Sequence, residues 1–130
     1  MFYECNKLLS IDLSNFNTNN VINMNSMFPG CSSLISLNLS NFNTNNVKYM
    51  NSMFSYCSSL TFLDLSNFNT INVNNMSYRL SYCSSLTSLN LSNFNTNNVI
   101  NIGGIFYGVN RKNCKLICEN ERILKEFNKK

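Results

Sequence analysis

Hydrophobic and polar positions recur along this chain with a period of 26 residues. The period is marked by four cysteines, Cys5, Cys31, Cys57 and Cys83. Alignment on these cysteines gives four units without insertions or deletions, at 5–30, 31–56, 57–82 and 83–108. Each unit contains the hexapeptide Leu-Ser-Asn-Phe-Asn-Thr, at 13–18, 39–44, 65–70 and 91–96. Self-similarity at such a period predicts a repeat architecture, in which each unit buries its apolar face against its neighbours.

The leucines of each unit predict a β-strand. Leu34, Leu37 and Leu39 have the spacing Leu-x-x-Leu-x-Leu, and the other units repeat it, with Ile11 as the middle residue of the first unit. Alternation with a period of two predicts a strand with one buried face. Copies of this strand are expected to pair in parallel, about 4.8 Å apart. The length of the unit and the spacing of its leucines are also those of leucine-rich repeats.

The second half of each unit predicts a short helix. Val47, Met50, Met53 and Phe54 have the spacing of one helical face. We expect about two turns of helix, begun by Thr44 or the next asparagine as N-cap. The four phenylalanines of the hexapeptide are expected to form a buried aromatic spine: Phe16, Phe42, Phe68 and Phe94. The predicted fold class is α/β, a leucine-rich-repeat solenoid with a parallel sheet on its concave face and short helices on its convex face.

The two ends of the array differ. Residues 1–108 are assigned to the array and residues 109–130 to a C-terminal cap, with a strand at 116–118 and an amphipathic helix at 120–127. The first residues match the end of a unit, so the chain is expected either to continue a preceding repeat or to leave its first repeat open. An open repeat exposes apolar surface and a strand edge, which favours self-association.

The repeat sequence resembles a known family. Leu-Asp-Leu-Ser-Asn-Phe-Asn-Thr-x-Asn-Val-x-x-Met-x-x-Met-Phe-x-x-Cys-Ser-Ser-Leu is similar to the BspA-like leucine-rich repeats, the 26-residue repeat of bacterial surface proteins, over residues 1–108. The resemblance implies a cell-surface or extracellular location, adhesion, and binding of host matrix or cell-surface proteins, with no catalytic residue. One unit departs from it, because Arg79 stands where two others have methionine. We expect that helix to be displaced, or the head of Arg79 to reach solvent.

Composition and charge narrow the function classes. The chain has 28 Asn and 18 Ser but only 16 charged residues, and an AT-rich genome is sufficient to explain most of this bias. An apolar fraction of 44% still suffices for a core. Charges balance over residues 1–108, whereas residues 109–130 carry the net +4. A neutral body with a basic tail does not indicate nucleic-acid binding. The sequence shows neither a transmembrane segment nor a signal peptide.

Candidate chemistry is sparse. The chain has no His, the commonest general base and zinc ligand. Asp12 and Asp64 are expected in the sheet about 10 Å apart, which is weak support for a catalytic pair. We therefore predict no enzyme activity, no cofactor and no metal. The repeat cysteines are predicted to be buried thiols, with disulfides or metal ligation as alternatives. Cys114 and Cys118 leave a terminal disulfide or a weak metal site open.

The predicted binding surface is the concave face of the sheet. Its candidate partner-binding residues are Ser10, Asp12, Ser36, Asn38, Phe62, Asp64, Ser88 and Asn90. Phe62 with Asp64 is the predicted hot spot, because exposed aromatic residues are favoured anchors. The alternative is a lone exposed phenylalanine without a role. A second face is offered by Tyr49, Tyr56, Tyr78 and Tyr82.

These features predict a non-catalytic protein-binding module, a surface adhesion or host-interaction fragment. The alternative is a self-associating structural array, which near-identical repeats and an open edge favour. A third hypothesis is that the regular Ser, Asn and Thr rows bind ice or a polysaccharide. Nucleic-acid binding would rest on the basic tail alone.

Overall fold

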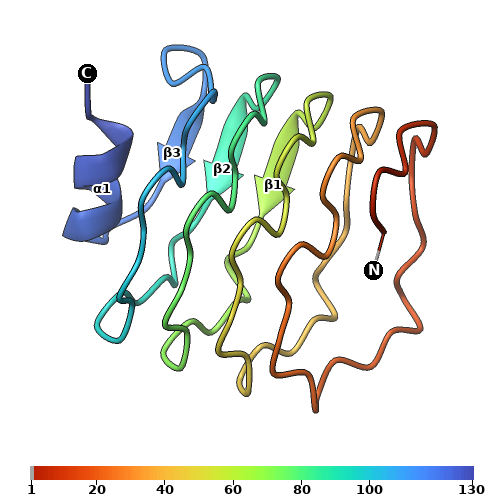
Figure 1. The fold of residues 1–130 in the computed structure, drawn as a ribbon, viewed down its shortest axis with the longest axis horizontal. Helices are drawn as coiled ribbons and strands as arrows, with labels where there is room; N and C mark the ends of the chain where they lie inside the picture. Colours follow the sequence, from red (N-terminus) through yellow and green to blue (C-terminus); the bar gives the residue numbers. More distant parts are fainter. Residues whose placement is uncertain (1) are drawn as a thin grey trace.

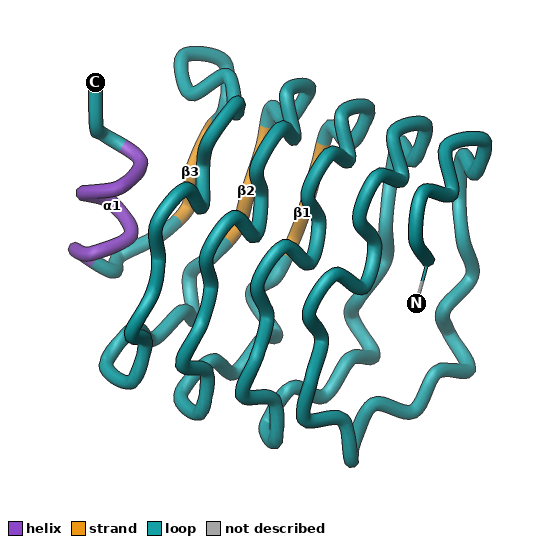
Figure 2. The backbone as a smooth tube through the Cα atoms, viewed as in Figure 1, coloured by secondary structure: helices purple, strands orange, loops and turns teal. Residues whose placement is uncertain are grey.

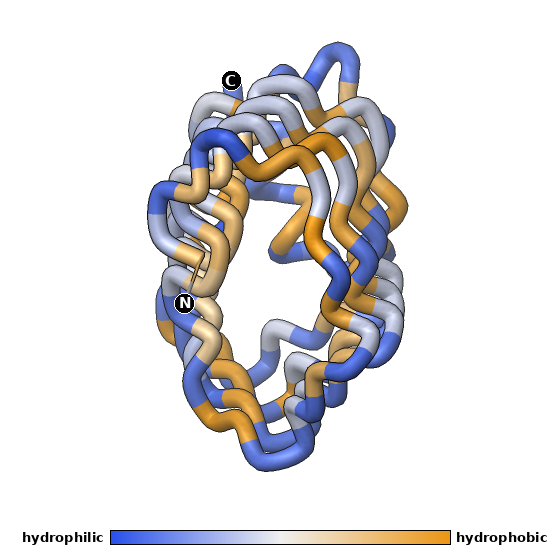
Figure 3. Tube along the Cα trace, turned by 90° about the vertical axis from the view of Figure 1, so that its right-hand side faces the viewer, coloured by the Kyte–Doolittle hydropathy of each residue, from blue (hydrophilic) through white to orange (hydrophobic). Residues whose placement is uncertain are grey.

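Each 26-residue unit forms one turn of a continuous coil, and successive turns lie side by side (Figure 1). This arrangement is seen in a computed structural model that describes residues 2–130. Viewed along the coil, the turns superimpose as a narrow oval (Figure 3). Leucine, methionine, valine and phenylalanine side chains from every turn meet in one buried cluster. The core therefore runs the length of the coil, between its two long walls.

One wall carries a short parallel sheet. Its strands are β1 (Phe62–Asp64), β2 (Ser88–Asn90) and β3 (Lys115–Ile117), in the order β1-β2-β3. Leu63 pairs with Leu89, and Leu89 with Leu116, so the 26-residue period reappears as the β1–β2 register. Most of the described chain is loop and turn (Figure 2). The first two units have no strand of their own, although the sequence predicts one in each.

The opposite wall is a second parallel ladder, and the predicted convex helices were wrong. Within residues 2–130 the sole helix is α1 (Glu121–Phe127). In the segment predicted as helix, the N–H groups of Met50, Ser52 and Phe54 donate to carbonyls 25 residues ahead, at 2.9–3.1 Å. These donors bond to the next turn, so they do not close helical rings. Ser52 has φ of +54°, and such left-handed residues interrupt a right-handed helix.

Asparagine and threonine side chains fix each turn to the next. The Thr44 hydroxyl donates to the carbonyl of Asn69 and accepts from its N–H, at 3.0 and 2.8 Å. Asn67 Nδ2 lies 3.0–3.3 Å from three carbonyl oxygens of the preceding turn. Neighbouring units repeat both arrangements. The threonine therefore bonds between turns and does not cap a helix, and a structural role accounts for asparagines that genome composition was expected to explain.

Aromatic rings and thiols fill the core. Phe42 and Phe68 of the predicted spine stack with centroids 6.4 Å apart. A second stack joins Phe28 to Phe54 at 5.7 Å. All six cysteines are free, and the Cys57 thiol donates to the carbonyl of Phe28 at 3.2 Å. Burial raises the pKa of Cys57 to about 12. The four buried thiols thus pack as small core groups, while Cys5 and Cys118 lie half-buried against the core.

Arg79 lies inside the core, which corrects both sequence expectations for it. Its side chain is 0% exposed, and its turn keeps the bonding of the other turns. The guanidinium carbon lies 4.9 Å from the ring centroid of Phe94 and 5.3 Å from that of Phe68. Nη1 contacts the sulfur of Met50 at 2.9 Å, while Nε has no hydrogen-bond partner. A charged group therefore occupies a site that other turns fill with methionine.

The helix α1 packs against the C-terminal end of the coil (Figure 1). Its Ile123 is fully buried, and Phe127 meets Phe106 edge-on at 5.1 Å. Asn120 caps the helix by accepting the N–H of Ile123 at 3.2 Å, and it also accepts the hydroxyl of Thr96 at 3.1 Å. Asn120 thus supplies the last turn with the hydrogen-bond partner that each earlier turn receives from the turn after it. The leucine-rich-repeat class itself stays a prediction.

Candidate binding site

The predicted site residues lie along the sheet wall. Phe62 and Asp64 flank the buried Leu63 in β1, and they pair with Ser88 and Asn90 of β2. The remaining candidates belong to the two preceding turns, where all four are exposed: Ser10, Asp12, Ser36 and Asn38. We call the eight residues together the sheet face. A groove of about 400 Å³ brings together four of them, Ser36, Asn38, Phe62 and Asp64.

Part of the sheet face has a structural task. The Asp64 carboxylate accepts the N–H of Ser66 at 2.9 Å, and Asp12, Asn38 and Asn90 each accept the N–H two residues ahead in the same way. Hydrogen bonds from Ser14, first from its hydroxyl and then from its backbone N–H, lower the pKa of Asp12. These side chains hold the turn that follows each strand segment. Phe62 is 52% exposed, and its role as the anchor of this face stays a prediction.

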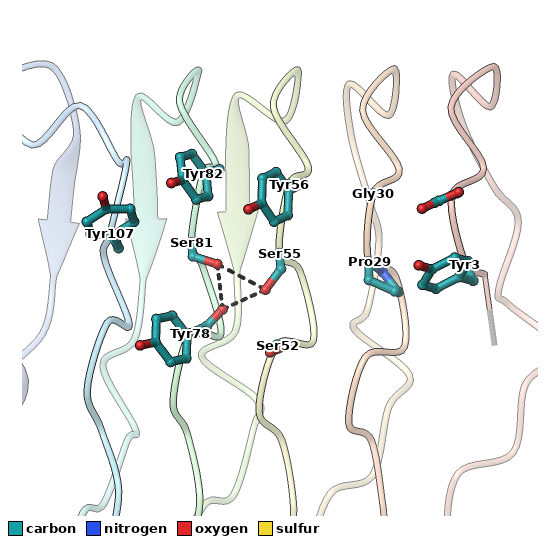
Figure 4. Close-up of a pocket in the computed structure, with 11 residues that line it drawn as sticks. Tyr3, Pro29, Gly30, Ser52, Ser55, Tyr56, Tyr78, Ser81, Tyr82 and Tyr107 are labelled. Carbon is teal, nitrogen blue, oxygen red and sulfur yellow. Dashed lines mark hydrogen bonds between the residues drawn. The ribbon is translucent and has the colours of Figure 1, made fainter.

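A larger groove, of about 740 Å³, opens on the other side of the coil. Five tyrosines line it, and we call it the tyrosine groove (Figure 4): Tyr3, Tyr56, Tyr78, Tyr82 and Tyr107. The rings of Tyr56 and Tyr82 stack with centroids 4.5 Å apart, and Tyr107 meets Tyr82 edge-on at 5.2 Å. The groove thus crosses from the first turns of the coil to the last (Figure 4).

Three of these tyrosines sit in a backbone conformation that favours glycine. Tyr56, Tyr78 and Tyr82 have φ of +64°, +52° and +59°. For a bulky residue this conformation costs on the order of 1–2 kcal/mol. Some other turns have glycine at the same places, as at Gly30 and Gly104, while others have Glu4, Ser26 or Ser52, also with positive φ. The tyrosines therefore occupy strained positions where glycine would relieve the backbone, which points to a use for their rings.

Buried hydroxyls support the floor of the groove. Ser55 Oγ and Ser81 Oγ both donate to the carbonyl of Tyr78, at 2.7 and 3.0 Å, and lie 3.1 Å from each other (Figure 4). Hydrogen bonding to Glu4 raises the pKa of Tyr3, and hydrogen bonding to Tyr107 raises that of Tyr82. At neutral pH Tyr3 and Tyr82 are therefore uncharged. The groove offers hydroxyl groups, aromatic surface and the carboxylate of Glu4.

Sequence reasoning found this groove in part. It singled out Tyr56, Tyr78 and Tyr82 but placed them beside helices, and it missed Tyr3 and Tyr107. A usable signal lies in the position just before each cysteine, where Glu4, Gly30, Tyr56, Tyr82 and, at the next 26-residue step, Gly108 align. All five have positive φ. A place that alternates between glycine and tyrosine indicates a left-handed turn with its side chain at the surface.

A family model described as "Mycoplasma protein of unknown function, DUF285" matches residues 1–118. The chain belongs to this family. The match corrects the expected membership of the BspA-like leucine-rich repeats, which is not the family found. Adhesion, host proteins as partners and a surface location therefore lose the support of that resemblance and stay predictions. Comparison of the DUF285 chain with curated proteins and with solved structures gave no match.

Further features of the DUF285 chain bear on partners. Within the described part, no helix has both the length and the apolar character needed to cross a bilayer. Among residues 2–130, no three His, Cys, Asp or Glu side chains gather as a metal site. The two Asp residues considered as a catalytic pair each bond to their own turn. The tyrosine groove and the sheet face are the two candidate surfaces.

Proposed function

We propose that this chain is a non-catalytic module that binds a protein partner in the tyrosine groove. The observation that carries the proposal is that Tyr56, Tyr78 and Tyr82 hold their rings at the surface from left-handed backbone positions. The stacking of Tyr56 on Tyr82 only offsets the backbone strain, and glycine serves the same turn elsewhere. The strain is accounted for if the rings make contacts with a ligand.

The chemistry of the groove favours a polypeptide ligand. Tyrosine supplies a large, rigid contact area with little loss of side-chain entropy, and its hydroxyl donates to and accepts from peptide groups. Exposed fractions of 55% for Tyr56, 55% for Tyr78 and 56% for Tyr107 leave this area free. The groove also spans several turns, so a segment of several residues is able to contact it along its length.

Peptide selection on the intact chain tests the proposal. A phage-displayed library of random peptides is selected on the wild-type chain, and each binder is then measured against Tyr56→Gly and Tyr82→Gly. These variants should fold, since Gly30 and Gly108 have the same backbone conformation in neighbouring turns. We expect at least about tenfold weaker binding, the effect of removing an aromatic anchor.

The matched control is Phe62→Ser, because the equivalent places in the other units, Ser10, Ser36 and Ser88, carry serine. Binders that lose affinity through Phe62→Ser but tolerate both tyrosine variants would move the site to the sheet face. Its groove beside Phe62 makes that face the second candidate. A library that yields no binder, from a chain whose light scattering grows with concentration, would favour the self-associating array.

A further inference from the structure

Each turn of the coil forms one step of the tyrosine groove, and one step contributes no aromatic ring. At this step the chain presents Pro29 and Gly30, between Tyr3 on one side and Tyr56 on the other (Figure 4). A Cβ built on Gly30 would lie 3.1 Å from Cγ of Glu4, so the backbone here passes close to the Glu4 side chain. We call this step the gap. The gap is bounded by two exposed rings and by one carboxylate-bearing side chain.

The gap has the dimension of a planar group. Adjacent turns of a parallel ladder are about 4.8 Å apart, so residues two turns apart are about 10 Å apart. A flat group in contact with a ring on each face needs about 7–8 Å, twice the ordinary separation of carbon atoms in contact. The separation of the two turns therefore leaves room for one flat group. A second tyrosine pair at ring-to-ring contact, like Tyr56 and Tyr82, would leave no such room.

The gap carries a carboxylate without an ion-pair partner among the described residues. Glu4 is the one charged residue that lines the tyrosine groove. The single ion pair within residues 2–130 joins Lys129 to Glu126 and does not involve Glu4. The Tyr3 side chain hydrogen-bonds to Glu4 but carries no positive charge. A ligand that enters the gap therefore meets an exposed carboxylate in a groove that Tyr3 and Tyr56 also line.

We infer that the gap receives an arginine side chain of the partner polypeptide. The inference rests on the proposed function and adds the chemistry of one contact. A guanidinium is planar, lies against aromatic rings through cation–π contact, and donates two parallel N–H bonds to a carboxylate. Tyr3, Tyr56 and Glu4 offer both kinds of contact in one place. A lysine ammonium would satisfy Glu4 but fill the space between the rings less well.

Titration with defined peptides tests the inference. The probes are acetyl-Gly-Ser-Arg-Ser-Gly-amide and its citrulline counterpart, which keeps the planar shape and loses the charge. Binding is followed by NMR on the chain with labelled tyrosine rings. We expect saturable shifts of the Tyr3 and Tyr56 signals with the arginine peptide, and at least about tenfold weaker binding of the citrulline peptide, the effect of losing a charge-assisted hydrogen bond.

Two variants test separately the contribution of the Glu4 carboxylate and that of the space between the rings. Glu4→Gln should weaken the arginine peptide about tenfold and leave the citrulline peptide unchanged. Gly30→Tyr should abolish binding of both, because its ring would continue the row of Tyr56 and Tyr82 across the gap. That variant is expected to fold, since Tyr56 and Tyr82 adopt φ of +64° and +59° where Gly30 has +71°.

The outcomes distinguish this inference from the proposed function. Equal affinity for arginine and citrulline, or unchanged binding to the Gly30→Tyr variant, would overturn the arginine contact. If the arginine peptide fails while library peptides still require Tyr56 and Tyr82, the groove binds a partner but the gap does not select arginine. If neither the probes nor the library bind, both proposals fail.

Discussion

Replacing Arg79 with methionine should stabilise the protein. Methionine occupies the same place in two other units, as Met27 and Met53, and both are buried. The substitution therefore fits an existing packing arrangement and removes a charge from the core. It is an unusual case in which a neighbouring repeat supplies both the replacement and the evidence that the replacement fits.

The magnitude follows from two opposing contributions. Burial lowers the pKa of Arg79 from its ordinary value to about 9, and at about 1.36 kcal/mol per pKa unit this fall corresponds to a desolvation cost of about 5 kcal/mol. Contacts with the rings of Phe54, Phe68 and Phe94 offset about 1 kcal/mol each. We expect Arg79→Met to raise the free energy of unfolding by about 2 kcal/mol, within the 1–4 kcal/mol typical of such replacements.

Urea denaturation at pH 7 measures this difference, with an expected rise of about 1 M in the midpoint. Met53→Leu is the control, since it changes a buried side chain of the same row without a charge and should cost less than about 1.5 kcal/mol. The folded-state pKa of Arg79 lies below its unfolded value, so the desolvation cost is complete below pH 9 and is relieved as the pH rises above about 9 toward the unfolded-state pKa. The advantage of Arg79→Met should therefore shrink above pH 9. A variant less stable than wild type would refute the reasoning, because the rings and sulfurs would then repay the whole desolvation cost.

Three other substitutions or conditions test the remaining structure. Asn67→Ala should lower the free energy of unfolding by about 1–3 kcal/mol, because three carbonyl contacts are lost, whereas the exposed Asn20→Ala should change it by less than about 0.5 kcal/mol in the same urea experiment. Tyr82→Gly should change thermal stability little, since relief of about 1 kcal/mol of backbone strain offsets the lost ring stacking of about 1 kcal/mol; a loss above 3 kcal/mol would show that the ring is structural. The folded-state pKa of Cys57 is raised to about 12, so its neutral thiol stabilises the fold fully below pH 9 and this contribution is lost as the pH rises from 9 toward 12. Stability measured in the Arg79→Met background, which removes the opposing titration, should therefore fall across that range, and Cys57 should resist iodoacetamide at pH 8.

The repeat length and the strand positions were accessible from the sequence, but the second wall was not. Leucine alternation places Leu63 and Leu89 inward, as the paired strands have them. The spacing of Val47, Met50 and Met53 fits one face of a helix, and it fits the inward side of a coil with left-handed turns equally well. Ser52 gives no sign of its positive φ, whereas a glycine there would have indicated the turn.

The candidate site, too, was only partly predictable from the sequence. Phe62 is recognisable because it breaks a row of serines, and it is exposed as expected. The tyrosine groove depends on where left-handed turns direct their side chains, which the residue types alone do not state. Arg79 was misjudged because a charge is normally assigned to the surface, and its contact rings come from three different turns.

The division of labour within each unit has a consequence for how such proteins diversify. Thr44, Asn67 and their equivalents hold one turn to the next, while the place occupied by Gly30, Tyr56 or Tyr82 contributes mainly to the surface. A unit is therefore exchangeable as a cassette, because duplication or recombination moves a ring, a gap or a carboxylate without changing the hydrogen bonds between turns. Each turn contributes its own residues to the groove, so new specificities arise by reordering units that already fold together.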